Sequence, residues 1–365
     1  MDPRPARISA VGQAMQDLDV AAMLLTPGPD LRYLTGYDAV PLERLTCLVL
    51  RAAQDPVLIV PALEALAADA AGIGQIGLTT LTWQETDDPW ELVAQLVPAR
   101  GRVAVDDRMW AQKVLAARSA LPGSEQVLAG PLIHPLRMRK DQAEIDALMA
   151  AGAAIDHVHA HVPGILRDGI SERAAGARIA ELILEAGHER VDFVIVASGP
   201  NAASPHHSVS DRIMRTGDVI VVDIGGTMPS GYCSDSTRMY ALSEPDVEFR
   251  ERYAVLQVAQ AAAVAAVTPG IPAQELDGVA RRILADNGLG DLFIHRTGHG
   301  IGLETHEDPY LVLGNSLAIE PGMAFSIEPG FYEAGRHGAR IEDIVICAGD
   351  GALSANSRPH DLIVL

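Results

Sequence analysis

The stretch VIVVDIGGTMPSGYCSDSTR, residues 219–238, decides how the second half of this chain folds. It opens with an apolar run that is typical of a buried strand, and Asp223 lies near the end of that run. Glycines at positions 225, 226 and 231 then predict a hairpin whose returning strand carries Asp235. Because burial of an unpaired carboxylate costs several kcal/mol, we expect a positively charged group to neutralise this pair.

Two later segments repeat the pattern of a carboxylate among residues that favour strands. Glu328 lies in MAFSIEPG (323–330), and Glu342 lies in ARIEDIV (339–345). A histidine lies in TGHGIG (297–302), where the glycines let the backbone approach an imidazole closely. We predict that a shared cation draws these segments together, and its expected ligands are Asp223, Asp235, His299, Glu328 and Glu342.

The charge of this ligand set indicates how many cations bind. Four carboxylates and one neutral imidazole carry a formal charge of −4, which two divalent ions would cancel. A single ion would leave negative charge stranded in the core. Oxygen-dominated ligation with one imidazole and no thiolate suits Mn²⁺ or Co²⁺, with Zn²⁺ as a further alternative. The sequence therefore predicts a dinuclear centre, for which Mn²⁺ is the first choice.

Composition argues against several classes of partner. The chain has 365 residues, with 48 acidic and 28 basic side chains and a net charge of −20, which disfavours nucleic acid and anionic membranes. Its three cysteines, at positions 47, 233 and 347, are odd in number and far apart, which argues against a disulfide framework. The sequence contains no signal-like or membrane-spanning segment, so we expect a soluble, cytoplasmic protein.

The pattern of helices and strands predicts two domains. Residues 1–135 alternate helical and strand patterns, which indicates an α/β layer, whereas residues 136–365 group their helices and strands in an α+β arrangement. The segment 131–140, with two prolines and several basic residues, is the expected hinge. Asp141 and Glu144 have the spacing of a capping box and predict the start of a long helix.

Six short strings, in this order, resemble one family of enzymes. They are SGPNAASPHH (198–207), GDVIVVDIGG (217–226), GYCSDSTR (231–238), HRTGHGIGLETHE (295–307), IEPGMAFSIEPG (319–330) and ARIED (339–343). Together they look like the signature of the pita-bread metallopeptidases, in particular the Xaa-Pro aminopeptidase and prolidase subfamily. YLTGY (33–37) and RMRKDQAEI (137–145) resemble the creatinase-type N-terminal domain and its junction, so the resemblance covers nearly the whole chain.

The resemblance implies a division of the ligands between two metal ions. Asp223, Asp235 and Glu342 would hold one ion, while Asp235, His299, Glu328 and Glu342 would hold the other. Asp235 and Glu342 would then bridge the two. The resemblance also implies a homodimer and short proline-containing peptides as substrates.

Four further residues receive roles from the same resemblance. His206 matches the family's proton-handling histidine, and His306 matches its substrate-contacting histidine. Tyr310 is an expected substrate-binding residue at a position where many strict prolidases carry an arginine, and no arginine occurs from residue 301 to residue 327. An exclusive dipeptidase is therefore doubtful from the sequence, and tripeptides should be cleaved at least as well. Arg340 is either a substrate-binding residue or a partner of the metal carboxylates.

The resulting expectation is a two-metal exopeptidase that cleaves the bond between an N-terminal residue and a following proline. One alternative keeps the fold but hydrolyses a small non-peptide C–N bond, as creatinase-like or ectoine-hydrolase-like relatives do. A second alternative is a catalytically inactive binding protein, which would require eroded ligands. All five expected ligand positions are retained, which favours the enzyme.

Overall fold

The computed structural model describes residues 2–52 and 54–365. The chain divides into two compact units, residues 1–137 and residues 138–365, and each is described by itself.

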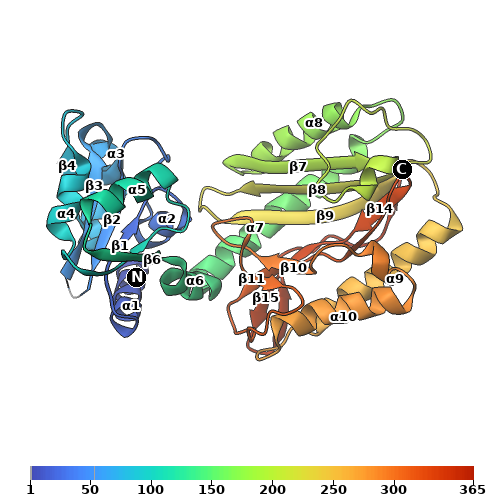
Figure 1. The fold of residues 1–365 in the computed structure, drawn as a ribbon. Helices are drawn as coiled ribbons and strands as arrows, with labels where there is room; N and C mark the ends of the chain where they lie inside the picture. Colours follow the sequence, from blue (N-terminus) through green and yellow to red (C-terminus); the bar gives the residue numbers. More distant parts are fainter. Residues whose placement is uncertain (1, 53) are drawn as a thin grey trace. The chain divides into compact units, whose positions relative to one another are not determined.

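The N-terminal unit is a mixed six-stranded sheet with helices packed against it (Figure 1). Its strand order is β4-β3-β2-β1-β5-β6, in which β1 pairs antiparallel with β2 and parallel with β5. The α/β architecture expected here is confirmed. Its elements are α1 (Arg4–Asp17), β1 (Val20–Leu25), α2 (Pro29–Thr35), β2 (Cys47–Arg51), β3 (Gln54–Pro61), α3 (Ala65–Ala70), β4 (Thr79–Trp83), α4 (Pro89–Leu96), β5 (Gly101–Val105), α5 (Ala111–Ala120) and β6 (Ser124–Leu128).

The segment expected to be a hinge is largely helical. Helix α6 (Gly130–Met138) contains both prolines of that segment. Pro131 lies in the first turn, where a backbone N–H has no helical partner to lose. Leu132 and Ile133 are buried, so their packing favours an ordered helix over an irregular linker.

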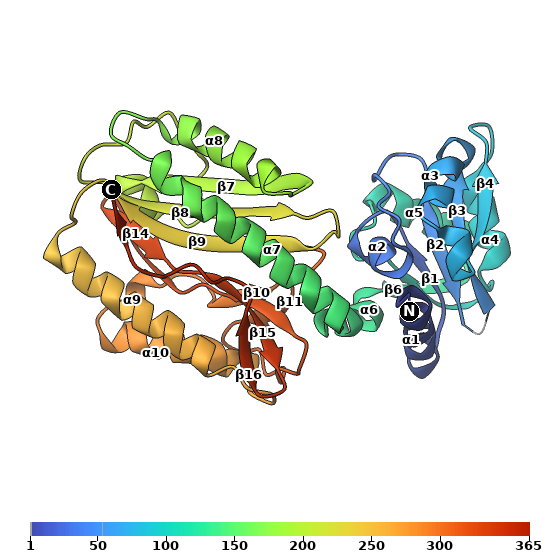
Figure 2. The same ribbon diagram turned by 180° about the vertical axis from the view of Figure 1, so that it is seen from behind.

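The C-terminal unit begins with the expected capping box. The Asp141 carboxylate accepts a hydrogen bond from the Glu144 N–H at 3.0 Å, and the Glu144 carboxylate accepts one from the Asp141 N–H at 2.9 Å. These bonds start α7 (Gln142–His161). Together with α8 (Glu172–Glu185), it covers a sheet of order β17-β9-β8-β7, and Figure 2 shows α7 running across these strands. The strands are β7 (Arg190–Ser198), β8 (Val219–Thr227), β9 (Cys233–Ala241) and β17 (Ile363–Val364).

The second half of this unit repeats the arrangement with a second helix pair. Helices α9 (Val247–Ala265) and α10 (Ala273–Asp286) share a core with a sheet of order β11-β10-β12-β15-β16. The grouped helices and largely antiparallel strands confirm the α+β class. The strands are β10 (Gly298–Gly300), β11 (Glu307–Leu311), β12 (Ala324–Ile327), β15 (Asp343–Ala348) and β16 (Gly351–Ser354), with a separate hairpin of β13 (Gly330–Glu333) and β14 (His337–Arg340).

Strand β8 is buried on both faces, which explains its continuous apolar run. Ile220 and Val222 belong to the core under α7 and α8, whereas Val219 and Val221 belong to the core under α9 and α10. Because side chains alternate along a strand, Asp223 lies on the second of these faces. An isolated bridge between Thr237 and Glu342 joins the edge of the strand pair to the later strands.

Candidate active site

The β8–β9 hairpin places its two acidic residues as diagonal neighbours on one face. Asp223 pairs with Thr237, and Asp235 pairs with Gly225, two positions farther along β8. Gly225 is required here, because a Cβ atom would lie 2.5 Å from the Phe193 ring and from a backbone oxygen. The hairpin therefore brings the two carboxylates together, as the sequence predicted.

The later strands bring the other three expected ligands to the same place. Glu342 directly precedes β15, and its carboxylate accepts a hydrogen bond from the Thr237 hydroxyl at 2.7 Å. His299 Nε2 lies 3.2 Å from Glu328 Oε1 and 3.8 Å from Asp235 Oδ2. His299 Nδ1 lies 3.1 Å from the Gly300 carbonyl, which assigns the proton to Nδ1 and leaves Nε2 as a ligand atom.

The electrostatics of this cluster fit a bound cation. Burial raises the pKa of Asp235 and Glu342, and repulsion from the neighbouring carboxylates raises it further. One buried oxygen of Asp223, Oδ1, has no hydrogen-bond partner among the described residues. Ligand atoms of Asp235, His299 and Glu342 all lie within 4.8 Å of one another. Carboxylates held this close and this deep need a positive charge that the protein supplies only in part.

Arg340 supplies positive charge to the acidic cluster from the protein itself. Its guanidinium, which is buried, donates to Asp223 Oδ2 and, at 2.8 Å, to the Tyr332 hydroxyl. With this cation included, four carboxylates carry a formal charge of −3 rather than the −4 counted from the ligands alone. The charge count therefore no longer distinguishes one divalent ion from two. Because Arg340 is engaged by protein groups, the geometry favours its role as a carboxylate partner over substrate binding.

A cavity of about 960 Å³ opens onto this cluster. Its apolar wall includes Phe193, Ile195 and Val209, and both predicted catalytic histidines, His206 and His306, line it. This combination of an apolar wall with a few convergent polar groups is typical of a small-molecule site.

The two histidines differ in their surroundings. The His306 ring packs edge-on against that of His299, with centroids 4.0 Å apart. Partial burial, with a further electrostatic contribution from the neighbouring His299, lowers the pKa of His306 to about 4, so it is neutral near pH 7. The His206 side chain makes no hydrogen bond to any residue in the ranges 2–52 and 54–365, so both ring nitrogens remain available to a ligand.

Sequence reasoning missed Arg296, which also lines the cavity. Its guanidinium lies over the ring of Tyr310, 4.2 Å from the centroid, and has no ion pair or hydrogen bond within the described part of the chain. Tyr310 pairs with His299 across β10 and β11, which brings its ring beneath Arg296. Arg296 precedes the segment 301–327 in the sequence and lies in the string HRTGHG, residues 295–300.

Comparisons with known proteins identify the family. Residues 146–348 match the model of metallopeptidase family M24, and residues 7–139 match the creatinase/prolidase N-terminal domain. This chain belongs to metallopeptidase family M24. The pita-bread fold and the resemblance recognised in the sequence are confirmed, and the protein is a metallo-exopeptidase.

Relatives within the M24 family match this chain along nearly its full length. A probable dipeptidase PepE of Mycobacterium tuberculosis is 51% identical over 98% of this chain and 96% of that protein. An Xaa-Pro dipeptidase of Lactobacillus delbrueckii is 37% identical over 92% of both chains. The crystal structure of dipeptidase PepE from Mycobacterium ulcerans superposes with a TM-score of 0.95, at 49% identity, over 99% of this chain and 97% of that one. No helix in the described part of this M24 protein is long and apolar enough to cross a membrane.

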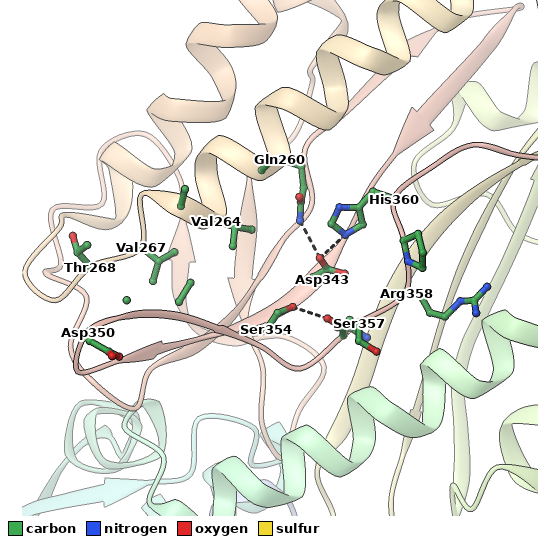
Figure 3. A pocket seen from close by; sticks show the side chains of 16 residues that line it. Gln260, Val264, Val267, Thr268, Asp343, Asp350, Ser354, Ser357, Arg358 and His360 are labelled. Carbon is green, nitrogen blue, oxygen red and sulfur yellow. Dashed lines mark hydrogen bonds and ion pairs between the residues drawn. The ribbon is translucent and has the colours of Figure 1, made fainter.

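A second cavity, of about 690 Å³, lies beside the residue that follows Glu342 (Figure 3). There the Asp343 carboxylate accepts hydrogen bonds from Arg238 and His360, each at 2.7 Å, and from Gln260 at 3.2 Å. Burial opposes the ionisation of Asp343, but the hydrogen bonds and charges of His360 and Arg238 outweigh it and lower the pKa of Asp343. This carboxylate is satisfied by the protein itself.

Proposed function

We propose that this M24 enzyme is a dinuclear Xaa-Pro dipeptidase, which hydrolyses the bond between an N-terminal residue and a C-terminal proline. The observation that carries the proposal is Arg296, a half-buried and unpaired guanidinium on the wall of the cavity that holds the acidic cluster. A dipeptide bound at the cluster presents its terminal carboxylate a short distance away. An arginine held flat on an aromatic ring is well suited to receive that carboxylate.

The acidic cluster would hold two divalent ions, for which Mn²⁺ is our first choice. Asp235 and Glu342 would bridge them, with Asp223 completing one site and His299 and Glu328 the other. Bound ions would supply a water molecule of lowered pKa and polarise the scissile carbonyl. Support comes from the unsatisfied Asp223 oxygen and the raised pKa values of Asp235 and Glu342.

The chain's own residues orient the substrate and handle its protons. Phe193, Ile195 and Val209 offer an apolar wall to the proline ring. His306, neutral near pH 7, can hydrogen-bond the substrate without adding charge. His206 can exchange a proton with the reacting groups through either of its available ring nitrogens. In this proposal Arg296, supported on Tyr310, serves as the carboxylate clamp that residues 301–327 lack.

The test compares two substrates that differ only in the terminal charge, Ala-Pro and Ala-Pro-amide. A charge-assisted hydrogen bond contributes about 1.5–3 kcal/mol, so kcat/KM should favour Ala-Pro by about 10- to 150-fold. Arg296→Gln should remove most of that preference by lowering only the Ala-Pro value. Arg282→Gln is the matched control, because the Arg282 side chain is exposed. It should change kcat/KM for neither Ala-Pro nor Ala-Pro-amide.

Other outcomes separate the competing functions. Equal rates for both substrates, with efficient cleavage of Ala-Pro-Ala, would establish an Xaa-Pro aminopeptidase, which the large cavity also accommodates. Failure to hydrolyse any proline peptide with Mn²⁺, Co²⁺ or Zn²⁺ present would favour the non-peptide C–N hydrolase. A homodimer and a cytoplasmic location remain predictions of the sequence, and sedimentation and cell fractionation would check them.

A further inference from the structure

A fully buried carboxylate outside the acidic cluster organises the loop that carries His206. Glu172 begins α8 and is 0% exposed. Its two oxygens accept hydrogen bonds from a run of residues that starts at the end of β7 and passes through His206. These donors are the N–H and hydroxyl of Ser198 at 2.8 and 2.7 Å, the side-chain amide of Asn201 at 3.0 and 3.1 Å, Nε2 of His207 at 2.8 Å, and the N–H and hydroxyl of Ser210 at 3.2 and 2.5 Å.

The number and kind of these donors keep Glu172 ionised. Burial alone would raise the pKa of its carboxyl, but hydrogen bonds from Ser210, Ser198 and His207 outweigh it and lower the pKa to about 2. A buried anion with this many donors has one satisfied arrangement of the surrounding loop. The carboxylate of Glu172 is therefore the common hydrogen-bond acceptor that orders the loop of residues 198–210.

The placement of His206 depends on its neighbours rather than on its own side chain. On one side, the Pro205 carbonyl accepts a hydrogen bond from Arg340 Nη1 at 3.3 Å, which ties it to the partner of Asp223. On the other side, His207 is tied to Glu172. His206 itself has no side-chain hydrogen bond to another described residue, so the backbone on its two sides sets where its ring lies in the cavity.

A second contact supports the same loop. The short helix Gly199–Ala203 packs on β14, where Gly338 lies so close that a Cβ atom would stand 2.2 Å from the Ala202 carbonyl oxygen. Strand β14 ends at Arg340, which pairs with Asp223. The loop is thus fitted between the acidic cluster and the buried Glu172.

We propose that Glu172 is a positioning residue that, through His207, fixes the loop of residues 198–210 so that His206 faces the reacting atoms. The inference rests on the proposed catalytic role of His206 and adds a reason why His207 lies beside it. Since misplacement of a catalytic group by about 1 Å costs about 100-fold in rate, loosening this loop should lower kcat more than it changes KM.

A double-mutant cycle tests the proposal with Ala-Pro as substrate in saturating Mn²⁺. Glu172→Gln keeps the size of the side chain but replaces one acceptor oxygen with a donor, and should lower kcat by about 10- to 100-fold with metal content unchanged. In the His206→Ala background the same substitution should cost less than about twofold, because no positioned imidazole remains to be displaced. An equal loss in both backgrounds would show a merely structural role and overturn the proposal.

Failure of the underlying function gives a different result. If His206→Ala itself retains full activity while the wild type cleaves Ala-Pro, the catalytic role of His206 is wrong and the positioning proposal falls with it. If Glu172→Gln lowers kcat and His206→Ala does as well, only the non-additivity between them decides.

His207 provides a second test that does not require a stable Glu172 variant. His207→Gln retains an N–H donor toward Glu172 and should keep kcat within about threefold, whereas His207→Ala should lose about tenfold. Equal losses from the two variants would remove His207 from the proposal.

Asp156 offers a matched control for simple loss of stability. It is also buried and accepts hydrogen bonds from a loop, including the N–H groups of Ser357 at 2.5 Å and Arg358 at 3.1 Å, but that loop carries no proposed site residue. Asp156→Asn should lower the melting temperature while leaving kcat for Ala-Pro unchanged. A comparable fall in kcat would mean that any loosened loop slows this enzyme, which contradicts a specific role for Glu172.

Discussion

Glu342 and Asp343 are consecutive buried carboxylates that face different surroundings. Glu342 lines the larger cavity with Asp223, Asp235 and Glu328, and burial together with their repulsion raises its pKa. Asp343 lines the smaller cavity, where hydrogen bonds and the charge of Arg238 lower its pKa despite burial (Figure 3).

The difference teaches how to distinguish a structural acid from a ligand. Asp343 has its donors within the protein, so its burial is balanced without any added group. Glu342 accepts a hydrogen bond from Thr237, but its acidic neighbours leave the cluster with excess negative charge. Burial is common to both residues and does not identify the metal ligand. The hydrogen-bond donors around each carboxylate distinguish the structural acid from the ligand.

The largest expected effect comes from breaking the cluster itself. Asp235→Asn and Glu342→Gln should each lower kcat by about 10³-fold or more, because both proposed ions lose a bridging ligand. Elemental analysis should show loss of both ions in these variants and retention of both in Asp343→Asn. One tightly bound ion in a fully active chain would reject the dinuclear centre.

A smaller but more diagnostic effect concerns stability after chelation. In the metal-free protein, Asp235→Asn should raise the free energy of unfolding because it relieves repulsion between the carboxylates. Asp343→Asn should lower that free energy by about 1–3 kcal/mol because a buried Arg238 loses its charged partner. Urea unfolding of the chelated variants would measure both. Changes of the same sign in the two variants would contradict the distinction drawn between the two acids.

The same pair should respond oppositely to pH in the metal-free protein. The folded-state pKa of Asp235 lies well above its ordinary value of 3.8. The protonated Asp235 therefore contributes to the stability of the fold fully below pH 3.8, and this contribution is lost as the pH rises through the folded-state pKa. The folded-state pKa of Asp343 lies below 3.8. The ionised Asp343 therefore contributes to the stability of the fold above pH 3.8, and this contribution is lost as the pH falls through the folded-state pKa. Unfolding curves of Asp235→Asn and Asp343→Asn against the wild type, from acid to neutral pH, would measure the two slopes.

The smallest expected effect is at the edge of the second cavity. His360→Ala removes one donor to Asp343, and because this side chain is 30% exposed, solvent can replace it at a cost of about 1 kcal/mol. Metal content and kcat should not change. Cys233→Ala, next to the hairpin turn, is a comparison variant that should likewise retain both ions.

Much of the fold and of the candidate site could be predicted because local patterns and chemistry agree. The apolar run around Asp223 indicated a buried strand, which the structure places between two cores, and the capping box at Asp141 marked a helix start to the residue. The five expected ligands were recognisable because charged side chains in such segments have few structural explanations. The helix at residues 130–138 was missed, since its two prolines, Pro131 in the first turn and Pro135 inside the helix, resemble those of a linker.

The sequence by itself determined the metallopeptidase family, the architecture of both units and the residues expected to bind metal, because each depends on short segments whose chemistry is visible in isolation. Only the tertiary structure decided that Arg340 pairs with Asp223, that Arg296 lies on Tyr310 in the cavity, and that Glu172 holds the loop of His206. These pairs join residues distant in sequence or on separate strands. Tertiary packing determines which of these residues are in contact, and a local sequence pattern contains no information about that packing.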